Sequence, residues 1–351
     1  MVTVLDCINR IPSKLIDIKN NRNNMLTQLK NYLQEETIRK IIFVASGSSY
    51  NAVHTTRSFF EKLGFEVQYI YPNLFLNYSE RLDSEALYVV VSQGGSTKLV
   101  FDSLKKIKEG GCKNLSITGD LSSPIANESD ISIDMGCGYE EFMYRTLGFS
   151  TTVATSFQLA MALASINHLI SEQFLEELDQ DYFEMISNLE KVRDISFSWY
   201  EKHRFTLMKK NIMIFSGTND LWPISNECDI KFMEMVPMMT RSFELEEFIH
   251  GPQNAFNDSM AFFILGKQGE DEEKVKSIAQ FLKNEIGFCS VVGNIGTDDR
   301  DLFFNVKSKN FSALEFVTTA QVIAYKLSID FGRDLSRPVN GQIKNYITKT
   351  L

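Results

Sequence analysis

The chain has 351 residues, of which 44% are hydrophobic and 23% charged, a composition typical of a globular protein long enough for two domains. Its formal net charge of −9 argues against non-specific binding to nucleic acid or to an anionic membrane, although a local pocket could still bind a small anion. The N-terminal residues lack a long apolar core and no apolar run approaches about 18 residues, so neither a signal peptide nor a membrane span is expected.

Cysteine and histidine usage bears on redox state and metal binding. The chain has five cysteines, an odd number, with no metal-ligand spacing: Cys7, Cys112, Cys137, Cys228 and Cys289. Such usage favours reduced thiols in the cytoplasm over a disulfide framework. Because only four histidines are present, a histidine-rich metal site is not expected.

In the first half of the chain, predicted strands alternate with helices. Residues 8–39 have helical and partly charged patterning, and a nearly all-apolar helix is expected over 150–170. Short apolar runs predict strands within 41–45, 66–71, 87–91, 114–120 and 131–135. This alternation is typical of α/β proteins whose parallel sheet is covered by helices on both faces.

The same strand–loop–helix unit recurs in the second half of the chain. The segment 260–287 closely parallels 86–111, with a strand, a short glycine loop, a helix and a final glycine. Two copies of one unit explain the length better than two unrelated domains. We therefore expect a first domain, with the N-terminal helix, over residues 1–190, and a second domain, with a C-terminal tail, over residues 191–351.

Two hydroxyl-rich loops follow the predicted strands that end at Ala45 and Val91. Their sequences are Ser46-Gly47-Ser48-Ser49 and Ser92-Gln93-Gly94-Gly95-Ser96-Thr97, and each leads directly into a helix. Ligands of open parallel sheets bind beyond the carboxyl ends of the strands, and helix N-termini favour anions. Hydroxyls add hydrogen-bond donors, and glycines let the backbone approach closely. A phosphate monoester fits such loops.

Neither loop matches the dinucleotide-binding or P-loop fingerprint. The simpler alternative is helix capping, because Ser and Thr are common N-cap residues. Two such loops at one edge of a sheet favour phosphate binding over capping alone. The residues expected to form this phosphate cradle are Ser46, Gly47, Ser48, Ser49, Ser92, Gln93, Gly94 and Thr97.

A predicted helix in the second domain carries three charged residues on one face. Glu227, Lys231 and Glu234 are spaced i, i+4 and i+7, while their neighbours are unusually apolar. Two interpretations stay open at this point. The residues could form a solvated stripe of ion pairs on the surface, or they could face a wet pocket.

His250 stands directly before Gly251-Pro252, which is a turn signal, so it should lie at the end of an element. Three acidic residues precede it: Glu244, Glu246 and Glu247. A carboxylate and an imidazole can hold different protonation states near pH 7, which makes them a standard acid–base pair. The alternative is a capping histidine or a core histidine with satisfied hydrogen bonds.

Taken together and in order, these segments resemble the sugar isomerase (SIS) domain family. The resemblance is carried by FVASGSSYNA, VSQGGST, ESDISIDMGCGYEEF, NECDIKFMEM and EEFIHGP, and it covers about residues 30–340. The most specific piece is ExxxKxxE followed by HGP, with Glu234 and His250 16 positions apart. In pattern the chain is similar to the isomerase half of glutamine–fructose-6-phosphate amidotransferase, which has two SIS domains.

The resemblance implies two flavodoxin-like α/β/α domains in tandem and a sugar phosphate held by the cradle. It implies that Glu234 moves a proton between C1 and C2 of the sugar and that His250 assists ring opening. Glu227 and Lys231 would support Glu234 on the same helix. It also implies a homodimer or higher homo-oligomer, in which the neighbouring subunit supplies His250. No metal or organic cofactor is implied, and neither nucleic acid nor a membrane is an expected partner.

Three departures from the family pattern bear on activity. The chain has no room for a glutaminase domain, so we do not expect it to draw ammonia from glutamine. The family's phosphate loop has a serine where this chain has Gly94, so one hydroxyl is missing. The amidotransferase also has a Schiff-base lysine five residues after the tail proline. Counted from Pro338, that position is Ile343, with Lys344 one residue later.

Stand-alone members of the family that lack the glutaminase domain include deglycases of fructosamine 6-phosphates. The leading hypothesis is therefore a deglycase or isomerase that acts on an amino-sugar or amine-linked hexose 6-phosphate. The alternatives are a plain aldose–ketose isomerase, a glucosamine-6-phosphate deaminase and a non-catalytic sensor of sugar phosphates. A sensor would not need both Glu234 and His250, and a purely structural protein would not need two polar loops at one sheet edge.

Overall fold

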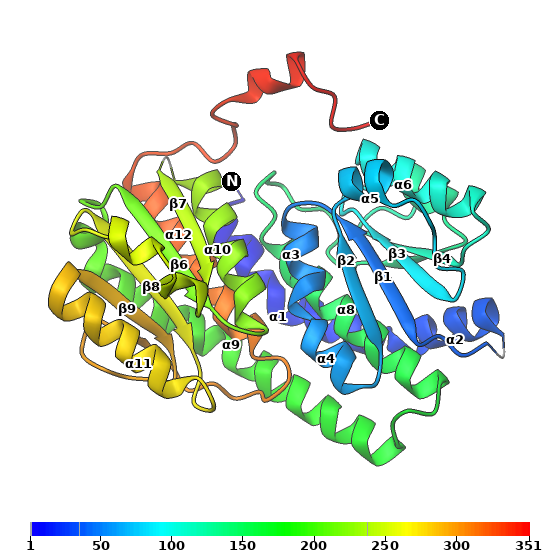
Figure 1. The fold of residues 1–351 in the computed structure, drawn as a ribbon, viewed down its shortest axis with the longest axis horizontal. Helices are drawn as coiled ribbons and strands as arrows, with labels where there is room; N and C mark the ends of the chain where they lie inside the picture. The colour runs from blue at the N-terminus through cyan, green and yellow to red at the C-terminus, as the bar shows by residue number, and fades with distance from the viewer. Residues whose placement is uncertain (1, 35, 237) are drawn as a thin grey trace. The chain divides into compact units, whose positions relative to one another are not determined.

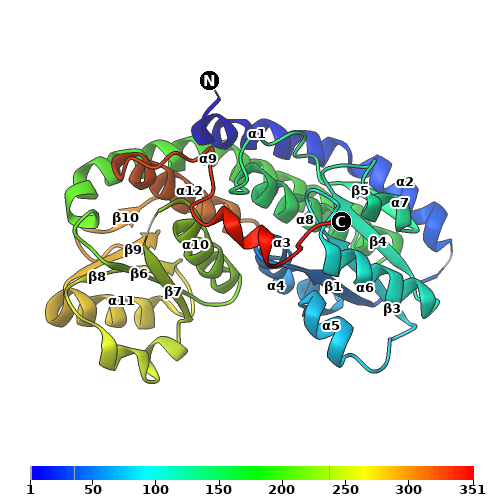
Figure 2. The same ribbon diagram turned by 90° about the horizontal axis from the view of Figure 1, so that it is seen from above.

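The computed structural model describes residues 2–34, 36–236 and 238–351 (Figures 1 and 2). The chain forms two compact units, which we name after their strands. The β1–β5 unit consists of Ser13–Glu177 and Arg337–Leu351. The β6–β10 unit consists of the chain up to Pro12 together with Leu178–Ser336.

The β1–β5 unit is built on a parallel sheet in the order β2-β1-β3-β4-β5. Its strands are β1 (Lys40–Ala45), β2 (Glu66–Ile70), β3 (Ala86–Val91), β4 (Asn114–Thr118) and β5 (Ile131–Asp134). Its helices are α2 (Arg22–Leu33), α3 (Ser48–Thr55), α4 (Arg57–Lys62), α5 (Pro72–Tyr78), α6 (Lys98–Glu109), α7 (Pro124–Glu128) and α8 (Leu147–Ile166). A short η4 turn (Gly341–Asn345) lies in the tail.

Helices cover both faces of this sheet, which explains why its central strands are apolar at nearly every position. On one face, Val44 and Tyr88 pack in a core cluster with Leu104 of α6. On the other face, the ring of Phe43 meets Phe60 of α4 with the ring centroids 5.5 Å apart. The result is a three-layer α/β/α arrangement (Figure 2).

The β6–β10 unit repeats this plan with a parallel sheet in the order β10-β9-β8-β6-β7. Its strands are β6 (Ile212–Gly217), β7 (Met239–Glu244), β8 (Met260–Gly266), β9 (Phe288–Gly293) and β10 (Leu302–Phe303). Its helical elements are α10 (Leu221–Met235), η1 (Glu247–Ile249), η2 (Pro252–Ala255), α11 (Glu272–Phe281), η3 (Leu282–Ile286) and α12 (Ala313–Asp330). The predicted α/β fold with two flavodoxin-like parallel-sheet domains in tandem is confirmed.

The limits of the two compact units differ from the predicted domain boundary, which divided the chain once, after residue 190. Their limits fall inside α1 (Val4–Asn20) and α9 (Glu172–Leu207), and the tail after Ser336 belongs to the β1–β5 unit. The start of α1 belongs with the second unit because Ile8 and Ile11 are buried and line a small hollow with Leu189. Contacts between segments distant in sequence cause this difference.

One local feature also differs from the prediction. β7 was not predicted as a strand, because its edge position leaves a mixed pattern with Met239 exposed and Thr240 buried. The nearly all-apolar helix expected over 150–170 is α8, which is long and apolar enough to cross a membrane by length and composition. However, 89% of its most apolar window is buried inside the protein, which is typical of a central core helix.

Candidate functional site

The two predicted phosphate loops start side by side on the β1–β5 sheet. Ala45 at the end of β1 pairs with Val91 at the end of β3, so Ser46 and Ser92 follow neighbouring strand ends. The chain leaves β1 toward β2 and leaves β3 toward β4, which makes this pair the topological switch point of the sheet. Open α/β sheets bind ligands in the crevice at that point.

The loop after β3 is organised by its own hydroxyls. The Oγ of Ser92 and the Oγ1 of Thr97 lie 2.8 Å apart in a hydrogen bond, and the N–H of Gly95 donates to the carbonyl of Ser92 at 3.0 Å. Thr97 is the N-cap residue of α6, yet within the described residues its side chain makes no capping hydrogen bond. Helix capping therefore does not account for the Thr97 hydroxyl.

The loop after β1 is tighter and more exposed. Gly47 is the N-cap residue of α3 and has φ +57°, a left-handed conformation that favours glycine. In the described chain, this N-cap position provides no side-chain hydrogen bond to the start of α3. Ser46 and Gly47 are exposed, whereas Ser48 and Ser49 are half-buried. The loop therefore presents hydroxyl and backbone groups at the sheet edge.

Gln93 is held in a fixed orientation by a buried acid that the sequence analysis did not identify. Its Nε2 donates to Oε2 of Glu140 at 2.9 Å. Glu140 also accepts hydrogen bonds from the backbone N–H groups of Thr146, Leu147 and Gly148 at the start of α8. The Gln93 amide is so close to Gly148 that a Cβ there would lie 1.9 Å from its Oε1. The Gln93 side chain is thus directed toward α8.

The sequence offered one signal for Glu140, since it is a polar residue that shortly precedes a nearly all-apolar helix. The helix α8 has no side-chain capping hydrogen bond from its N-cap residue Thr146 in the described chain, and Glu140 takes over this function from six residues earlier. Its negative charge is favourable at the positive end of the helix dipole. Spacing alone could not reveal this, since a loop brings Glu140 back to the helix.

The C-terminal tail pairs with the loop after β3. Thr350 forms an isolated antiparallel bridge with Thr97, the N–H of Lys98 donates to the carbonyl of Lys349 at 3.0 Å, and the N–H of Leu351 donates to the carbonyl of Ser96 at 2.9 Å. Lys344, which stands one residue after the position of the family's Schiff-base lysine, lies in the exposed η4 turn of the same tail. The tail therefore accepts a hydrogen bond from one of the backbone N–H groups at the start of α6.

An aromatic cluster lies directly behind the loop after β1. The rings of Tyr50 and Tyr71 stack with their centroids 4.0 Å apart, and the His54 ring lies 5.0 Å from that of Tyr69. Burial lowers the pKa of His54 to about 4, so its imidazole is neutral near pH 7. Burial likewise raises the pKa of Tyr50 to about 12.

In the β6–β10 unit, the three charged residues of α10 form a largely buried cluster. The side chains of Glu227 and Lys231 are each 1% exposed, whereas that of Glu234 is 36% exposed. The Nζ of Lys231 lies 3.4 Å from Oε1 of Glu227 and 3.1 Å from Oε2 of Glu234. The solvated surface stripe is therefore the wrong interpretation for Glu227 and Lys231. Glu234 alone of the three reaches solvent.

His250 ends the short η1 turn and is exposed, with 58% of its side chain accessible. Its Nδ1 lies 2.9 Å from the backbone carbonyl of Glu246 and 3.7 Å from the Oε1 of that residue. The neighbouring carboxylate of Glu246 is itself bonded to Lys274, which lowers its pKa. A buried core histidine is thus excluded, and Nε2 is the ring nitrogen turned away from Glu246.

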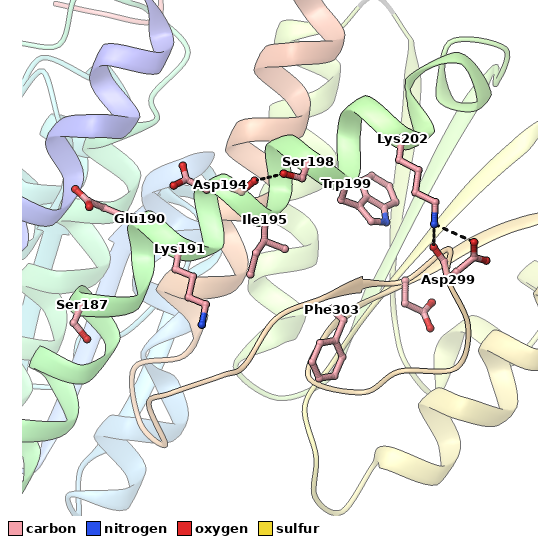
Figure 3. A pocket seen from close by; sticks show the side chains of 11 residues that line it. Ser187, Glu190, Lys191, Asp194, Ile195, Ser198, Trp199, Lys202, Asp299 and Phe303 are labelled. Atoms are coloured by element: carbon pink, nitrogen blue, oxygen red, sulfur yellow. Dashed lines mark hydrogen bonds and ion pairs between the residues drawn. The ribbon is translucent and has the colours of Figure 1, made fainter.

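The hollow along α9 in Figure 3 has a volume of about 740 Å³ but contains none of the predicted site residues, within the described chain. The polar groups that line it largely form hydrogen bonds with one another. Lys202 donates to both the backbone carbonyl and the carboxylate of Asp299, and Ser198 donates to the carbonyl of Asp194 (Figure 3). In the part of the chain that the structure describes, no cluster of three or more His, Cys, Asp or Glu residues could hold a metal ion.

Comparisons with known proteins agree with this architecture. Residues 36–167 match the family model described as the SIS domain. The chain is 24% identical over 314 residues to glutamine–fructose-6-phosphate aminotransferase (isomerizing) from Clostridium tetani, which covers 88% of this chain and 52% of the relative. The enzyme of the same name from Thermococcus kodakarensis is 23% identical, with 86% and 51% covered. The chain thus spans about half the length of the curated relatives that it matches.

Solved structures show the same fold. A protein from Clostridium difficile, described as a candidate phosphosugar isomerase, superposes with a TM-score of 0.92 at 24% identity, covering 100% of this chain and 99% of that one. The C-terminal domain of glucosamine-fructose-6-phosphate aminotransferase from Francisella tularensis has a TM-score of 0.87 at 19% identity, with 94% and 96% covered. Glucosamine-6-phosphate deaminase from Thermotoga maritima has a TM-score of 0.74 at 22% identity, with 96% and 99% covered.

Proposed function

We infer from the match of residues 36–167 to the SIS domain model that this chain acts on a sugar phosphate. From that premise, we propose that it is a deglycase acting on amine-linked hexose 6-phosphates of the fructosamine type. The observation that carries this proposal is the Glu227–Lys231–Glu234 cluster, in which a buried lysine holds the partly exposed Glu234 at 3.1 Å. A partly exposed carboxylate that is oriented by a buried ammonium group is suited to remove a proton from a bound sugar.

The phosphate of the substrate would occupy the cradle at the β1/β3 switch point. Three groups support this assignment: the paired hydroxyls of Ser92 and Thr97, the Ser46–Ser49 loop with its two exposed first residues, and the backbone around Gly94. The amide of Gln93 is bonded to Glu140, so we assign Gln93 a positioning role through its backbone. The missing hydroxyl at Gly94 would leave the cradle with fewer donors than is usual in the family.

In the proposed reaction, Glu234 removes a proton from C1 of the open-chain substrate while His250 donates one to the C2 oxygen. The product is an enaminol. Glu234 then returns its proton to C2, and the nitrogen lone pair forms an iminium bond to C1. Water adds to C1, the C1–N bond breaks, and the products are the free amine and glucose 6-phosphate. General acid–base steps of this kind each contribute about 10²–10⁴-fold in rate.

A direct assay tests the proposal. Purified protein is mixed in turn with fructoselysine 6-phosphate, glucosamine 6-phosphate and fructose 6-phosphate, and the release of amine, ammonia and glucose 6-phosphate is followed. Release of lysine with glucose 6-phosphate in equal amounts is the expected result. Ammonia from glucosamine 6-phosphate alone would favour a deaminase, and tight binding without turnover would favour a sensor.

We further propose a homodimer or higher homo-oligomer in which one subunit supplies His250 to the site of the other. Mixing an inactive Glu234→Gln variant with an inactive His250→Asn variant tests this arrangement. Shared sites would restore up to about a quarter of the activity after subunit exchange, whereas sites within one subunit would restore none beyond the parents. All five cysteines are buried and none forms a disulfide bond in the described chain, which supports placement in the reducing cytoplasm.

A further inference from the structure

The β6–β10 sheet has a switch point of its own, and a cavity opens there. The chain leaves β6 toward β7 and leaves β8 toward β9, while β6 and β8 pair side by side (Figure 1). The cavity has a volume of about 210 Å³, which corresponds to about seven water molecules at about 30 Å³ each. It therefore has room for one small molecule, at the point where open α/β sheets bind their ligands.

The loops after β6 and β8 give this cavity polar groups as well as an apolar wall. Three uncharged polar side chains line it: Thr218, Asn219 and Gln268. In the part of the chain that the structure describes, none of these side chains forms a hydrogen bond, so their hydroxyl and amide groups are available to a ligand. Each of these groups can both donate and accept. The buried side chains of Leu265 and Val275 form the apolar wall.

The lysine that lines the cavity, Lys267, is already bound to the protein's own groups. Its Nζ lies 3.0 and 2.8 Å from the two carboxylate oxygens of Asp220 and 3.2 Å from the hydroxyl of Ser312. The structure thus gives its three N–H groups three acceptors. Among the described residues that line the cavity, no other side chain is cationic. The cavity therefore offers no uncompensated positive charge to an anion.

Carboxylates in the loop after β8 also oppose a phosphate. Glu270 and Asp271 line the cavity, and no ion pair neutralises either of them in the described chain. Asp271 is the N-cap residue of α11, and Glu272 and Glu273, which pair with Lys276, follow in the first turn. In the phosphate cradle, by contrast, the described first turns of α3 and α6 contain no acidic residue. The two switch points therefore share an architecture but differ in charge.

We propose that this second switch point binds an unphosphorylated sugar, whose hydroxyls form hydrogen bonds with Thr218, Asn219 and Gln268. The side chains offer donors and acceptors together, as sugar hydroxyls do. The C–H face of a sugar ring suits the wall formed by Leu265 and Val275, and such a ligand brings no phosphate to meet the carboxylates. The exposed carboxylates would in addition suit a sugar that carries an amine. The tandem repeat would thus hold a phosphorylated sugar at one switch point and an unphosphorylated sugar at the other.

Hydrogen exchange locates the site, and calorimetry measures the affinity, with D-glucose, D-glucosamine and glucose 6-phosphate as probes of the full chain. We expect glucose and glucosamine to slow exchange in segments 218–222 and 267–271, and glucose 6-phosphate to slow it there far less. Gln268→Ala and Thr218→Val should each weaken glucose binding about five- to tenfold, since each removes one hydrogen bond. Thr218→Ser should retain it. Gln280→Ala, at an exposed position of α11 outside the cavity, is the control, and all variants should keep their melting temperature.

The sugar site is overturned if neither glucose nor glucosamine protects the two segments, or if Gln268→Ala binds glucose as well as Gln280→Ala does. Binding of glucosamine without glucose would also overturn it, because the carboxylates would then form a cation site. Equal protection by glucose 6-phosphate would overturn the exclusion of phosphate and the assignment that follows from it. None of these measurements uses turnover, so the deglycase proposal can fail while this site stands.

Discussion

Gln93 and Glu140 are joined by a hydrogen bond of 2.9 Å that ties the loop after β3 to the first turn of α8. The same carboxylate also accepts hydrogen bonds from the backbone N–H groups at the start of α8. One buried acid therefore positions a ligand-binding loop and also caps a core helix. The orientation of the loop is consequently coupled to the stability of the helix.

Replacing this acid should affect both elements. In Glu140→Gln, the new NH₂ group faces backbone N–H groups, so the buried donors lose acceptors at a cost of about 1–3 kcal/mol in the free energy of unfolding. Hydrogen exchange should rise at Leu147 and Gly148, and the affinity for fructose 6-phosphate should fall. The neighbouring Glu141→Gln, which alters an exposed side chain, is the control. Unchanged exchange at α8 would refute the capping role.

Glu234 is expected to be needed for chemistry but not for binding. Glu234→Gln keeps the shape of the side chain and a hydrogen-bond partner for Lys231, while it removes the basic oxygen. We expect kcat to fall by about 10²–10⁴-fold with little change in the dissociation constant for fructose 6-phosphate. Glu273→Gln, at a side chain that is 88% exposed, should leave both quantities unchanged. Retained turnover in Glu234→Gln would exclude this residue as the base.

Lys231 should matter strongly for stability, because it is a buried charge that pairs with two carboxylates. Lys231→Met leaves Glu227 buried without this partner and should reduce the free energy of unfolding by about 3–5 kcal/mol. The double variant Glu227→Gln/Lys231→Met should recover part of that loss. Urea denaturation measures both. The control is Lys276→Met, which breaks the more exposed pair with Glu272 and should cost about 1 kcal/mol or less.

Two adjacent glycines in the loop after β3 should differ sharply in their tolerance of a methyl group. At Gly95, with φ +60°, a Cβ would lie 1.9 Å from the Oγ and 2.3 Å from the Cβ of Ser123. We expect Gly95→Ala to destabilise the fold by about 1–3 kcal/mol and to weaken fructose 6-phosphate binding. At Gly94 the nearest atom would be 4.0 Å away, so Gly94→Ala should fold normally. Equal stability of both variants would contradict the close approach of Gly95 to Ser123.

His54 should make stability depend on pH in the acid range. Its pKa in the folded protein is about 4, below the ordinary value of 6.5, because burial disfavours the imidazolium. Below pH 6.5 the unfolded chain binds a proton that the folded chain does not, so this contribution is present above 6.5 and is lost as the pH falls toward 4. The loss should be about 1–3 kcal/mol after allowance for solvent at this partly exposed ring.

The matched variant for this titration is His54→Phe, which retains an aromatic ring beside Tyr50 and Tyr69. Denaturation of both proteins at about pH 5 and about pH 7.5 separates His54 from the carboxylates that titrate in the same range. The stability of the unaltered protein should fall further than that of the variant. If the two curves run parallel, the imidazole is not neutral in the folded state.

Local sequence patterns were enough to predict the fold class, the tandem repeat and the two loops at one sheet edge. Strand and helix periodicity, with glycines and hydroxyls after Ala45 and Val91, is local information, and the pairing of these two residues in the structure agrees with it. The charged face of α10 was also visible, because spacing i, i+4 and i+7 follows from helix geometry alone.

Which charges are buried and which segments meet depends on tertiary packing. Helical spacing cannot tell whether Glu227 and Lys231 face water, because burial depends on the elements that pack against α10. The pairing of Thr350 with Thr97, the capping of α8 by Glu140 and the cavity between the loops after β6 and β8 all join residues that are separated along the chain. Such contacts arise when loops close during folding, and no local pattern encodes them.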